Sequence, residues 1–460
     1  MTSRFPRSRH FLVECGARIL LPFVFKVIVR LNRQKRWSMY ASLSRFSISV
    51  VVIVSLAGCG GSSNSSSTGG GGTGGTDGGS TSVTFTITGG TPIAVATQVG
   101  SGSFTAARLS GGSLTLSLPS GTSNFAVAYA CSALPWYMPP VTPTIDEYVY
   151  QASTQDGTSL RGSCANLNSS QGRVTVQVST SAIPGANMVT VQGLAMMEAS
   201  GGTIDFSGTM TAGTYDVFIF VQDIDNNLLA LKVLRSQTIP GALNGGNPVI
   251  FQTSDETTLQ AITYSNPPSG FSPSQYILYE TSGGASTTLD VLGSTTQYPA
   301  MPVSAFQNGD YYLFDAAASS GNEAVGVEKF TSSVGPQGFT FPAPWTYPGP
   351  TAAALPTINF DYPGFSGMSS VSSVAAIQWN RGNGTPLNNG ISVFTTANYR
   401  NGATAVTIPD LSGVRGFLAP AASGSTIEWF ATVQQGDPAA STPPSGTVQY
   451  VVNNGTYTVP

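Results

Sequence analysis

Residues 213–236 read GTYDVFIFVQDIDNNLLALKVLRS, and this stretch decides the fold class. A glycine opens an aromatic-rich run, a few residues rich in Asp and Asn follow, and a second apolar run returns. Aromatic and β-branched residues favour strands. Asp and Asn between two apolar runs are typical of a tight turn. The stretch therefore predicts a β-hairpin.

The same pattern occurs four times, each copy opening on a glycine: Gly121, Gly213, Gly309 and Gly424. In each copy a hairpin is followed by a short closing strand. RVTVQV (173–178) either closes the first copy or opens the second, and we expect TVQYVV (447–452) and GTYTVP (455–460) to be the return and closing strands of the fourth. Six or seven strands in about 100 residues suit an immunoglobulin-like sandwich. The sequence thus predicts an all-β chain of about four tandem β-sandwiches, with a β-propeller of two blades per copy as the alternative.

The last copy carries the closest family resemblance. The segments INFDYPGFSGMSSVSSVAAIQW (358–379) and TIEWFATVQQG (426–436) resemble a fibronectin type III domain, with a Pro-containing first strand and a Trp in the second. The resemblance implies that Trp379 is the core tryptophan and that Trp429 is its neighbour.

The domain organisation follows from these repeats and from the composition between them. We expect a signal region, a lipidated Cys with a Gly/Ser linker, three sandwiches, a Pro-rich linker and a fourth, fibronectin III-like sandwich. The predicted boundaries are 1–58, 59–82, 83–172, 173–256, 257–343, 344–356 and 357–460.

The apolar run at 46–56 is too short to span a bilayer and suits the core of a signal peptide. It ends in Leu56, Ala57, Gly58 and Cys59, which resemble the lipobox of bacterial lipoproteins. The resemblance implies that cleavage leaves Cys59 as an acylated N-terminus that holds the protein on a membrane surface. Gly60 stands where the family's inner-membrane retention signal would be Asp, so we expect an outer-membrane lipoprotein that faces the periplasm or the outside.

Two segments flank this signal. Met39 opens a signal peptide of ordinary length, so we expect the true start there and residues 1–38 outside the mature protein; a long basic extension is the alternative. Residues 60–82 are almost entirely Gly, Ser and Thr, and such a flexible coil reaches about 25 to 30 Å. The tether would let folded domains stand off the membrane.

Removal of the signal region changes the charge. Ten of the 19 basic residues and one of the 22 acidic residues precede Cys59, which leaves 9 basic and 21 acidic residues and a net charge of −12. This charge disfavours nucleic acid as a partner. The only histidine, His10, is also removed, so no Ser-His-Asp or Cys-His catalytic unit can form in the mature chain.

Two cysteines remain after Cys59. Cys131 and Cys164 most simply pair in an exported chain, and closing a loop of about 34 residues would contribute on the order of 3 to 4 kcal/mol. A reactive or metal-binding thiol pair is the alternative.

Two Pro-stiffened segments display aromatic residues that could bind a ligand. Trp136 and Tyr137 lie within the expected disulfide loop, and Trp345 and Tyr347 lie in the expected linker between the last two sandwiches. Such side chains can stack on sugar rings or fill a partner's pocket. They can equally cap a sandwich or wedge two domains together.

The charged residues indicate a binding site less strongly. Asp223 and Asp225 could bind calcium, but they lack the full loop pattern and suit a hairpin turn better. Lys232 and Lys329 occupy matching places in two return strands, where outward-facing lysines would discourage edge pairing. The pair also resembles the isopeptide-forming lysines of Gram-positive pilin domains, although in that family the lysine lies on an early strand.

These observations favour a non-catalytic envelope protein that serves as a stalk, adhesin or binding module. The expected partners are the membrane, through the N-terminal lipid, and a glycan or an envelope protein; no cofactor is expected. The alternative is an envelope polysaccharide-active enzyme that uses two carboxylates, since that chemistry needs no histidine.

Overall fold

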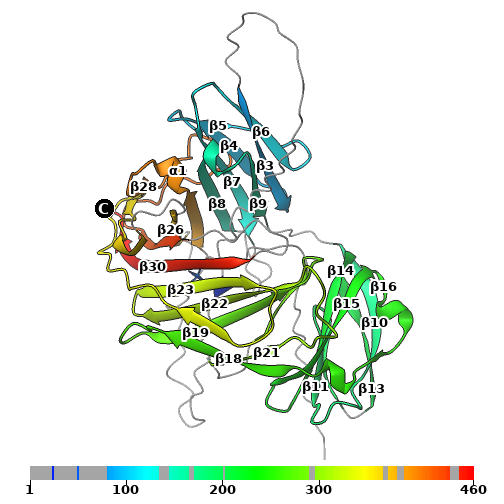
Figure 1. Cartoon of the computed structure of the whole chain (residues 1–460). Coiled ribbons are helices and arrows are strands. Elements are labelled where there is room, and N and C mark those ends of the chain that lie inside the picture. The colour runs from blue at the N-terminus through cyan, green and yellow to red at the C-terminus, as the bar shows by residue number, and fades with distance from the viewer. Residues whose placement is uncertain are drawn as a thin grey trace, which may run out of the picture.

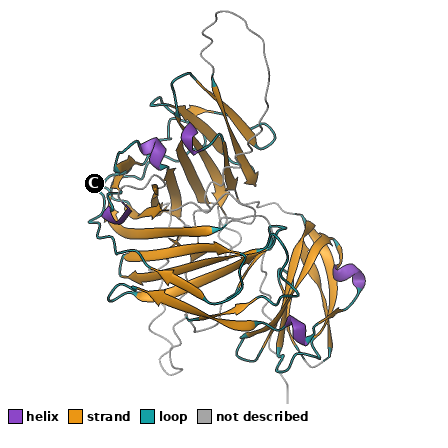
Figure 2. Cartoon of the chain, in the orientation of Figure 1, coloured by secondary structure: helices purple, strands orange, loops and turns teal. Residues whose placement is uncertain are grey.

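The computed structural model describes residues 23–24, 49–50, 80–133, 144–164, 170–199, 202–289, 296–365, 371–380, 388–435 and 445–460. These residues are nearly all β (Figure 2), as the sequence predicts. One short α-helix, α1 (Ala397–Arg400), and a few 3-10 turns interrupt the strands. Two short strands near the N-terminus, β1 (Phe23–Val24) and β2 (Ser49–Val50), pair antiparallel.

The first module is a two-layered sandwich. Its strands are β3 (Thr81–Gly89), β4 (Ala94–Val99), β5 (Thr105–Ala106), β6 (Ser113–Leu118), β7 (Asn124–Ala133), β8 (Thr144–Ser153) and β9 (Ser159–Cys164). The order β6-β3-β9 forms one layer and β5-β4-β7-β8 the other. Alternation along β7 explains the packing, because Phe125, Val127 and Tyr129 enter the core between the layers. Ala126 and Ala128 face the other side.

The second module is a separate sandwich. Its strands are β10 (Gln171–Ser179), β11 (Met188–Val191), β12 (Ala195–Glu198), β13 (Thr203–Thr211), β14 (Gly213–Gln222), β15 (Leu228–Ile239), β16 (Gly241–Ala242) and β17 (Val249–Ile250). The sheet β12-β11-β14-β15 packs on a layer in which β10 pairs with β13, β16 and β17. The hairpin of the opening stretch is β14 and β15, and this module has its own apolar core.

The third and fourth modules repeat the two-layer plan. The third contains β18 (Thr258–Ser265), β19 (Ser272–Glu280), β20 (Ser286–Thr288), β21 (Gln297–Ala300), β22 (Tyr311–Ser320), β23 (Glu323–Thr331) and β24 (Gln337–Thr340). The fourth contains β25 (Thr357–Asn359), β26 (Val371–Asn380), β27 (Asn388–Thr395), β28 (Ala405–Thr407), β29 (Thr426–Gln435) and β30 (Gly446–Thr458). The smaller layers are β21-β18-β24 in the third module and β25-β28 in the fourth.

The sheets of three modules are joined into one. A twelve-stranded sheet runs β20-β19-β22-β23-β30-β29-β26-β27-β8-β7-β4-β5 (Figure 1). The third module joins the fourth through the antiparallel pair β23 and β30, and the fourth joins the first through the parallel pair β27 and β8. The sheet ends at two very short strands, which limits further edge pairing. Because both ends are open, the described strands do not close into a propeller.

The cores lie on opposite faces of this sheet. Val149 on β8 and Val393 on β27 pair and share the large core of the third and fourth modules. Tyr150, the next residue of β8, points into the core of the first module. Successive side chains of a strand face opposite ways. The small layer of the first module therefore covers the opposite face from those of the third and fourth.

The four repeat glycines have a common backbone role. The φ angles are 80° at Gly121, 150° at Gly213, 93° at Gly309 and 82° at Gly424. L-residues rarely adopt such values, which explains why glycine opens each copy.

The structure decides one strand assignment that the sequence left open and corrects another. RVTVQV opens the second module: it lies in β10, which pairs with β13, and β9 closes the first module beside β3. TVQYVV and the first four residues of GTYTVP are not two strands but parts of β30, because β29 runs alongside it from Gln449 to Thr458. The predicted tryptophan pair is confirmed, since Trp379 and Trp429 are both buried in the core on adjacent strands.

Candidate functional site

The candidate site lies where the second module meets the third, and it begins with an irregularity in the hairpin of β14 and β15. Tyr215 pairs with Gln237 and Val217 pairs with Leu234, so one residue of β14 faces two of β15. This is a β-bulge, a feature that redirects side chains. Ser236 takes a left-handed φ of 50°, and its N–H donates to Asp216 Oδ1 at 2.8 Å. The bulge therefore fixes the Asp216 carboxylate beside Arg235.

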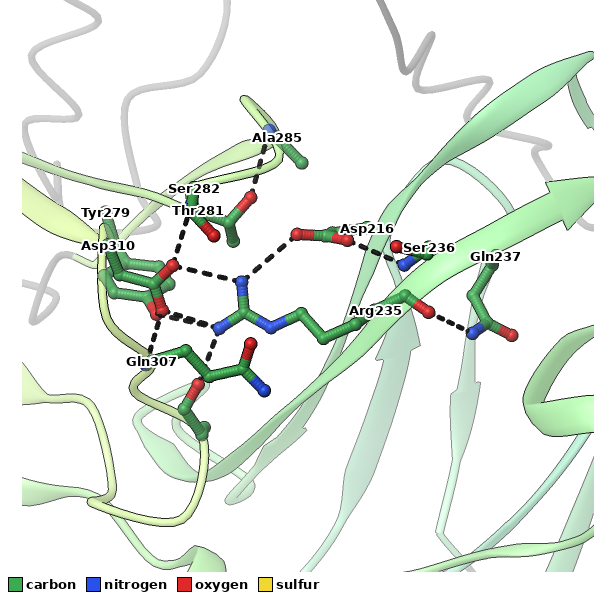
Figure 3. Close-up of polar contacts among 11 residues, drawn as sticks. Asp216, Arg235, Ser236, Gln237, Tyr279, Thr281, Ser282, Ala285, Gln307 and Asp310 are labelled. Atoms are coloured by element: carbon green, nitrogen blue, oxygen red, sulfur yellow. Dashed lines mark hydrogen bonds and ion pairs between the residues drawn. The ribbon is translucent and has the colours of Figure 1, made fainter. Parts of the chain in front are cut away.

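Arg235 reaches from β15 into the third module (Figure 3). Its Nη2 donates to Asp310 Oδ2 at 2.6 Å and to the Ala305 carbonyl at 2.8 Å, and its Nη1 lies 3.2 Å from Asp310 Oδ1. The same Nη1 donates to Asp216 Oδ2 at 3.1 Å. The planar guanidinium thus binds one carboxylate from each module, and its contact with Asp310 is bidentate.

Asp310 is fully buried and saturated with donors. Besides Arg235, it accepts from the Tyr279 hydroxyl and from the backbone N–H groups of Ser282 and Gln307, both at 2.8 Å. Burial alone would raise the pKa of this carboxyl, but the hydrogen bonds from Arg235, Tyr279 and the two backbone groups hold it below the ordinary value. Asp310 is therefore a permanent anion at neutral pH.

An apolar contact surrounds this ionic one. Phe218 and Leu231, on the outer face of the second module, are almost completely buried in the core of the third. The Phe218 ring meets the Tyr279 ring edge to face, with centroids 6.0 Å apart. Burying each apolar side chain of this size contributes roughly 1.5 to 3 kcal/mol. The two modules are fixed to each other by packing and by charge.

A second ionic contact lies at the same junction, beside a cleft. Lys232 Nζ lies 2.8 Å from Asp255 Oδ2, and the Ser304 hydroxyl donates to Asp255 Oδ1 at 3.2 Å. Asp255 lies in the segment between the modules. The cleft has a volume of about 310 Å³ and is lined by Lys232, Val233, Leu234, Asn244, Val249, Ile250, Asp255, Ser304 and Ala305. Every ion pair between side chains in the described part of the chain lies at this junction.

Of the four aromatic residues predicted to bind a ligand, two lie in the described part of the chain and two do not. Trp136 and Tyr137 lie outside the described residues, as does Cys59. Trp345 is only 4% exposed; its ring stacks on Tyr347 at 5.1 Å, and Tyr347 meets Trp429 edge to face. The Tyr347 hydroxyl accepts from the Asn359 N–H. These two aromatics wedge the segment between the third and fourth modules into their common core, so the Trp345 ring is not available at the surface.

The predicted disulfide is present and has a clear structural role. Cys131 and Cys164 are joined with their Cα atoms 5.5 Å apart. Cys131 lies on β7 and Cys164 on β9, so the bond connects the two layers of the first module.

The Asp223 carboxylate is occupied by its own turn. Its Oδ1 accepts from the backbone N–H groups of Asp225 and Asn227 at 2.9 and 2.8 Å, and its Oδ2 accepts from the Asn227 side chain at 2.9 Å. These bonds lower the pKa of Asp223. The hairpin interpretation therefore describes this segment. Among the described residues, no three carboxylate, thiol or imidazole groups gather where they could hold a metal ion.

Two other buried carboxyl groups form no ion pair with a basic side chain in the described part of the chain. Asp315 and Glu328 face each other across β22 and β23, and the Tyr450 hydroxyl donates to Asp315 Oδ1 at 2.6 Å. Burial raises the pKa of Asp315 to about 6, and burial beside Asp315 raises the pKa of Glu328 well above its ordinary value. These two acids lie within the sheet at the junction of the third and fourth modules.

Another buried acid that forms no ion pair among the described residues, Glu147, lies where the first module meets the fourth. Its Oε1 accepts from the Leu418 N–H, while its Oε2 has no hydrogen-bond partner among the described residues. Burial raises the pKa of Glu147 to about 7; the Leu418 N–H lowers it and the nearby Asp410 raises it further.

Sequence reasoning missed the junction residues. Arg235 and Asp310 are 75 positions apart, and neither belongs to a motif. Lys232 lies on the edge strand β15, as predicted, although it also pairs with Asp255, whereas the prediction is wrong for Lys329, because β23 lies inside the large sheet and not at its edge. One feature of the sequence could have indicated the junction residues. Few basic residues follow Cys59, and two of these, Lys232 and Arg235, lie on one predicted strand, which favours a structural role for both.

Comparisons with known proteins add little. No protein-family model matches the chain, and no curated protein matches it. Among solved structures, the Bacteroides ovatus mixed-linkage glucan utilization locus SGBP-B, in complex with a mixed-linkage heptasaccharide, is 10% identical over 81% of this chain and 93% of that chain, with a TM-score of 0.12. At this TM-score the two folds do not superpose, and the similarity says nothing about function. Within the described residues, no helix is long and apolar enough to cross a bilayer.

Proposed function

We propose that this protein is a non-catalytic, lipid-anchored protein of the cell envelope whose β-sandwiches form a rigid binding module. The observation that carries the proposal is the junction between Arg235 and Asp310. Because a buried bidentate ion pair and an apolar interface fix the second module to the third, and continuous sheet pairing links the third, fourth and first, the modules hold one shape. A rigid array suits presentation of a binding surface at a distance from the membrane.

The sequence supports the location. The apolar core, the lipobox resemblance at Cys59 and the Gly/Ser tether at 60–82 occur in the order that an anchored, exported protein requires. Gly60 favours the outer membrane. The disulfide between Cys131 and Cys164 agrees with an oxidising compartment.

The described carboxylates support a non-catalytic role. A glycosidase needs one protonated and one ionised carboxyl group facing an open cleft. Asp216 and Asp310 share Arg235, whereas Asp315 and Glu328 are 2% and 5% exposed and face each other inside the structure. The first pair joins two modules, and in the second Asp315 accepts a hydrogen bond from the Tyr450 hydroxyl. The partners we propose are a glycan or an envelope protein.

The test combines anchoring with turnover. Cells expressing the full chain or its Cys59→Ser variant are fractionated, and intact cells are treated with protease. The purified protein is then incubated with envelope polysaccharides, and released reducing ends are measured. We expect membrane attachment that depends on Cys59 and no release of reducing ends. Release that is abolished by Asp315→Asn or Glu328→Gln would instead establish the carboxylate enzyme, and attachment without Cys59 would refute the lipid anchor.

A further inference from the structure

The cleft beside Lys232 opens along a strand edge that no other described strand covers. Its lining includes three consecutive residues of β15, from Lys232 to Leu234, and β15 is the last strand of its sheet. Nearer the start of β15, Ala230 pairs with Glu256 in an isolated bridge, so the edge is covered there. An uncovered edge presents backbone N–H and C=O groups that can bind a ligand.

Side chains from both modules add donors and acceptors. Lys232 gives one of its three N–H groups to Asp255, and the Phe251 ring lies 5.7 Å below its ammonium group. The Asn244 side chain donates its amide hydrogens to the carbonyls of Asn247 and Pro248, which leaves its Oδ1 as an acceptor. The Ser304 hydroxyl, from the third module, can donate its one hydrogen to the Ser254 carbonyl at 3.0 Å or to Asp255 Oδ1 at 3.2 Å, and its oxygen keeps lone pairs that can accept.

Apolar side chains stand beside these polar groups. Ile250 lines the cleft and is 56% exposed, and Val303, which precedes Ser304, is 88% exposed. Covering large aliphatic side chains that are this exposed removes apolar surface from water, which favours ligand binding.

We propose that this cleft binds one or two units of a neutral saccharide, held by Lys232, Asn244 and Ser304 and covered on its apolar face by Ile250. The proposal rests on the proposed function as a binding module and names its ligand class. A volume of about 310 Å³ is at the small end of the range of ligand sites, roughly 300 to 1,000 Å³.

Charge selects against ionic ligands. Asp255 neutralises Lys232 at 2.8 Å, so neither an anion nor a cation meets a net opposite charge in the cleft. Hydroxyl groups donate and accept at once, which matches a mixture of ammonium, amide, hydroxyl and backbone groups. The C–H face of a sugar ring suits the aliphatic side of the cleft.

The experiment uses the full-length protein on an array of neutral and uronic acid-containing oligosaccharides, followed by calorimetric titration of the best-retained neutral sugar. Two variants leave the ion pair intact: Ile250→Ser removes the apolar side, and Asn244→Gly removes the amide while tolerating the φ of 54° at this position. Lys329→Ala, on β23 outside the cleft, is the matched control. Melting temperatures confirm that each variant is folded.

We expect retention of a neutral sugar, at least tenfold weaker binding in both cleft variants, and unchanged binding in the control. The proposal would be overturned if the array retained no neutral sugar, if it retained acidic sugars in preference, or if both cleft variants bound the sugar as tightly as the wild-type protein. Attachment through Cys59 and the absence of turnover are measured separately, so a failure here does not count against the envelope role.

Discussion

Arg235 and Asp310 meet in a bidentate ion pair, with nitrogen to oxygen distances of 2.6 and 3.2 Å, although they belong to different modules. Five hydrogen bonds converge on the Asp310 carboxylate, which has no exposed surface. Removal of Arg235 would be destabilising, because the Asp310 charge would remain buried without its partner.

Replacing Arg235 should therefore free the second module. We expect Arg235→Ala to destabilise the junction by about 3 to 5 kcal/mol. Hydrogen exchange should become faster at the backbone amides of Ser282 and Gln307, and small-angle scattering should show a larger radius of gyration. Arg173→Ala, which removes an exposed arginine of β10, is the control. Equal exchange in the two variants would show that the ion pair does not hold the junction.

Glu147 should make stability depend on pH. Its folded pKa, about 7, lies above the usual value near 4.3, so the protonated form favours folding. The contribution is fully present below about pH 4, declines as the pH rises between the two values, and is lost above about pH 7. Glu147→Gln should stabilise the protein by on the order of 2 to 3 kcal/mol at pH 8 and have little effect at pH 4, measured by urea unfolding. The same gain at both pH values would contradict this mechanism.

Gly326 makes room for Tyr450. A Cβ at Gly326 would overlap the Tyr450 ring, whereas one at Gly338 would meet only Thr263 Oγ1 at 3.4 Å. We expect Gly326→Ala to destabilise the protein by about 3 kcal/mol, because the ring must move away from Asp315, and Gly338→Ala to cost much less. Equal melting temperatures for the two variants would rule out this close packing between the third and fourth modules.

The disulfide should stabilise the first module. Cys131→Ala with Cys164→Ala should lower the free energy of unfolding by about 3 kcal/mol, since the bond closes a long loop between two layers. Denaturant unfolding of the double variant and of the reduced wild-type protein should agree. Alkylation of either thiol in the oxidised wild-type protein would be inconsistent with the bond.

Asp223 should act through its turn and not through calcium. Asp223→Ala should destabilise the protein by about 1 kcal/mol through loss of turn hydrogen bonds. Addition of millimolar calcium should leave the wild-type melting temperature unchanged. A rise that disappears in Asp223→Ala and Asp225→Ala would restore the calcium interpretation.

Local features of this chain were readable from the sequence. The alternation of large and small side chains in β7 and the glycine before it specify a strand and its sharp start, because both depend on residues close in the chain. The pairing of Cys131 with Cys164 followed from their being the two thiols left after Cys59, and Trp379 with Trp429 followed from a family pattern. In the fourth copy, by contrast, two apparent strands separated by Asn453 and Asn454 form the single strand β30, because pairing along β29 overrides local turn preference.

The sequence by itself determined the all-β class, the repeated hairpins and the disulfide, since each is encoded in short-range pattern or in a small number of candidate residues. Only the tertiary structure decided that β27 pairs with β8, that β30 pairs with β23, and that Arg235 binds Asp310. The physical reason is that a strand edge bonds through backbone groups common to all residues, and that an ion pair needs only proximity. The sequence therefore does not indicate which edges or which charges will meet, and this is decided when the modules dock.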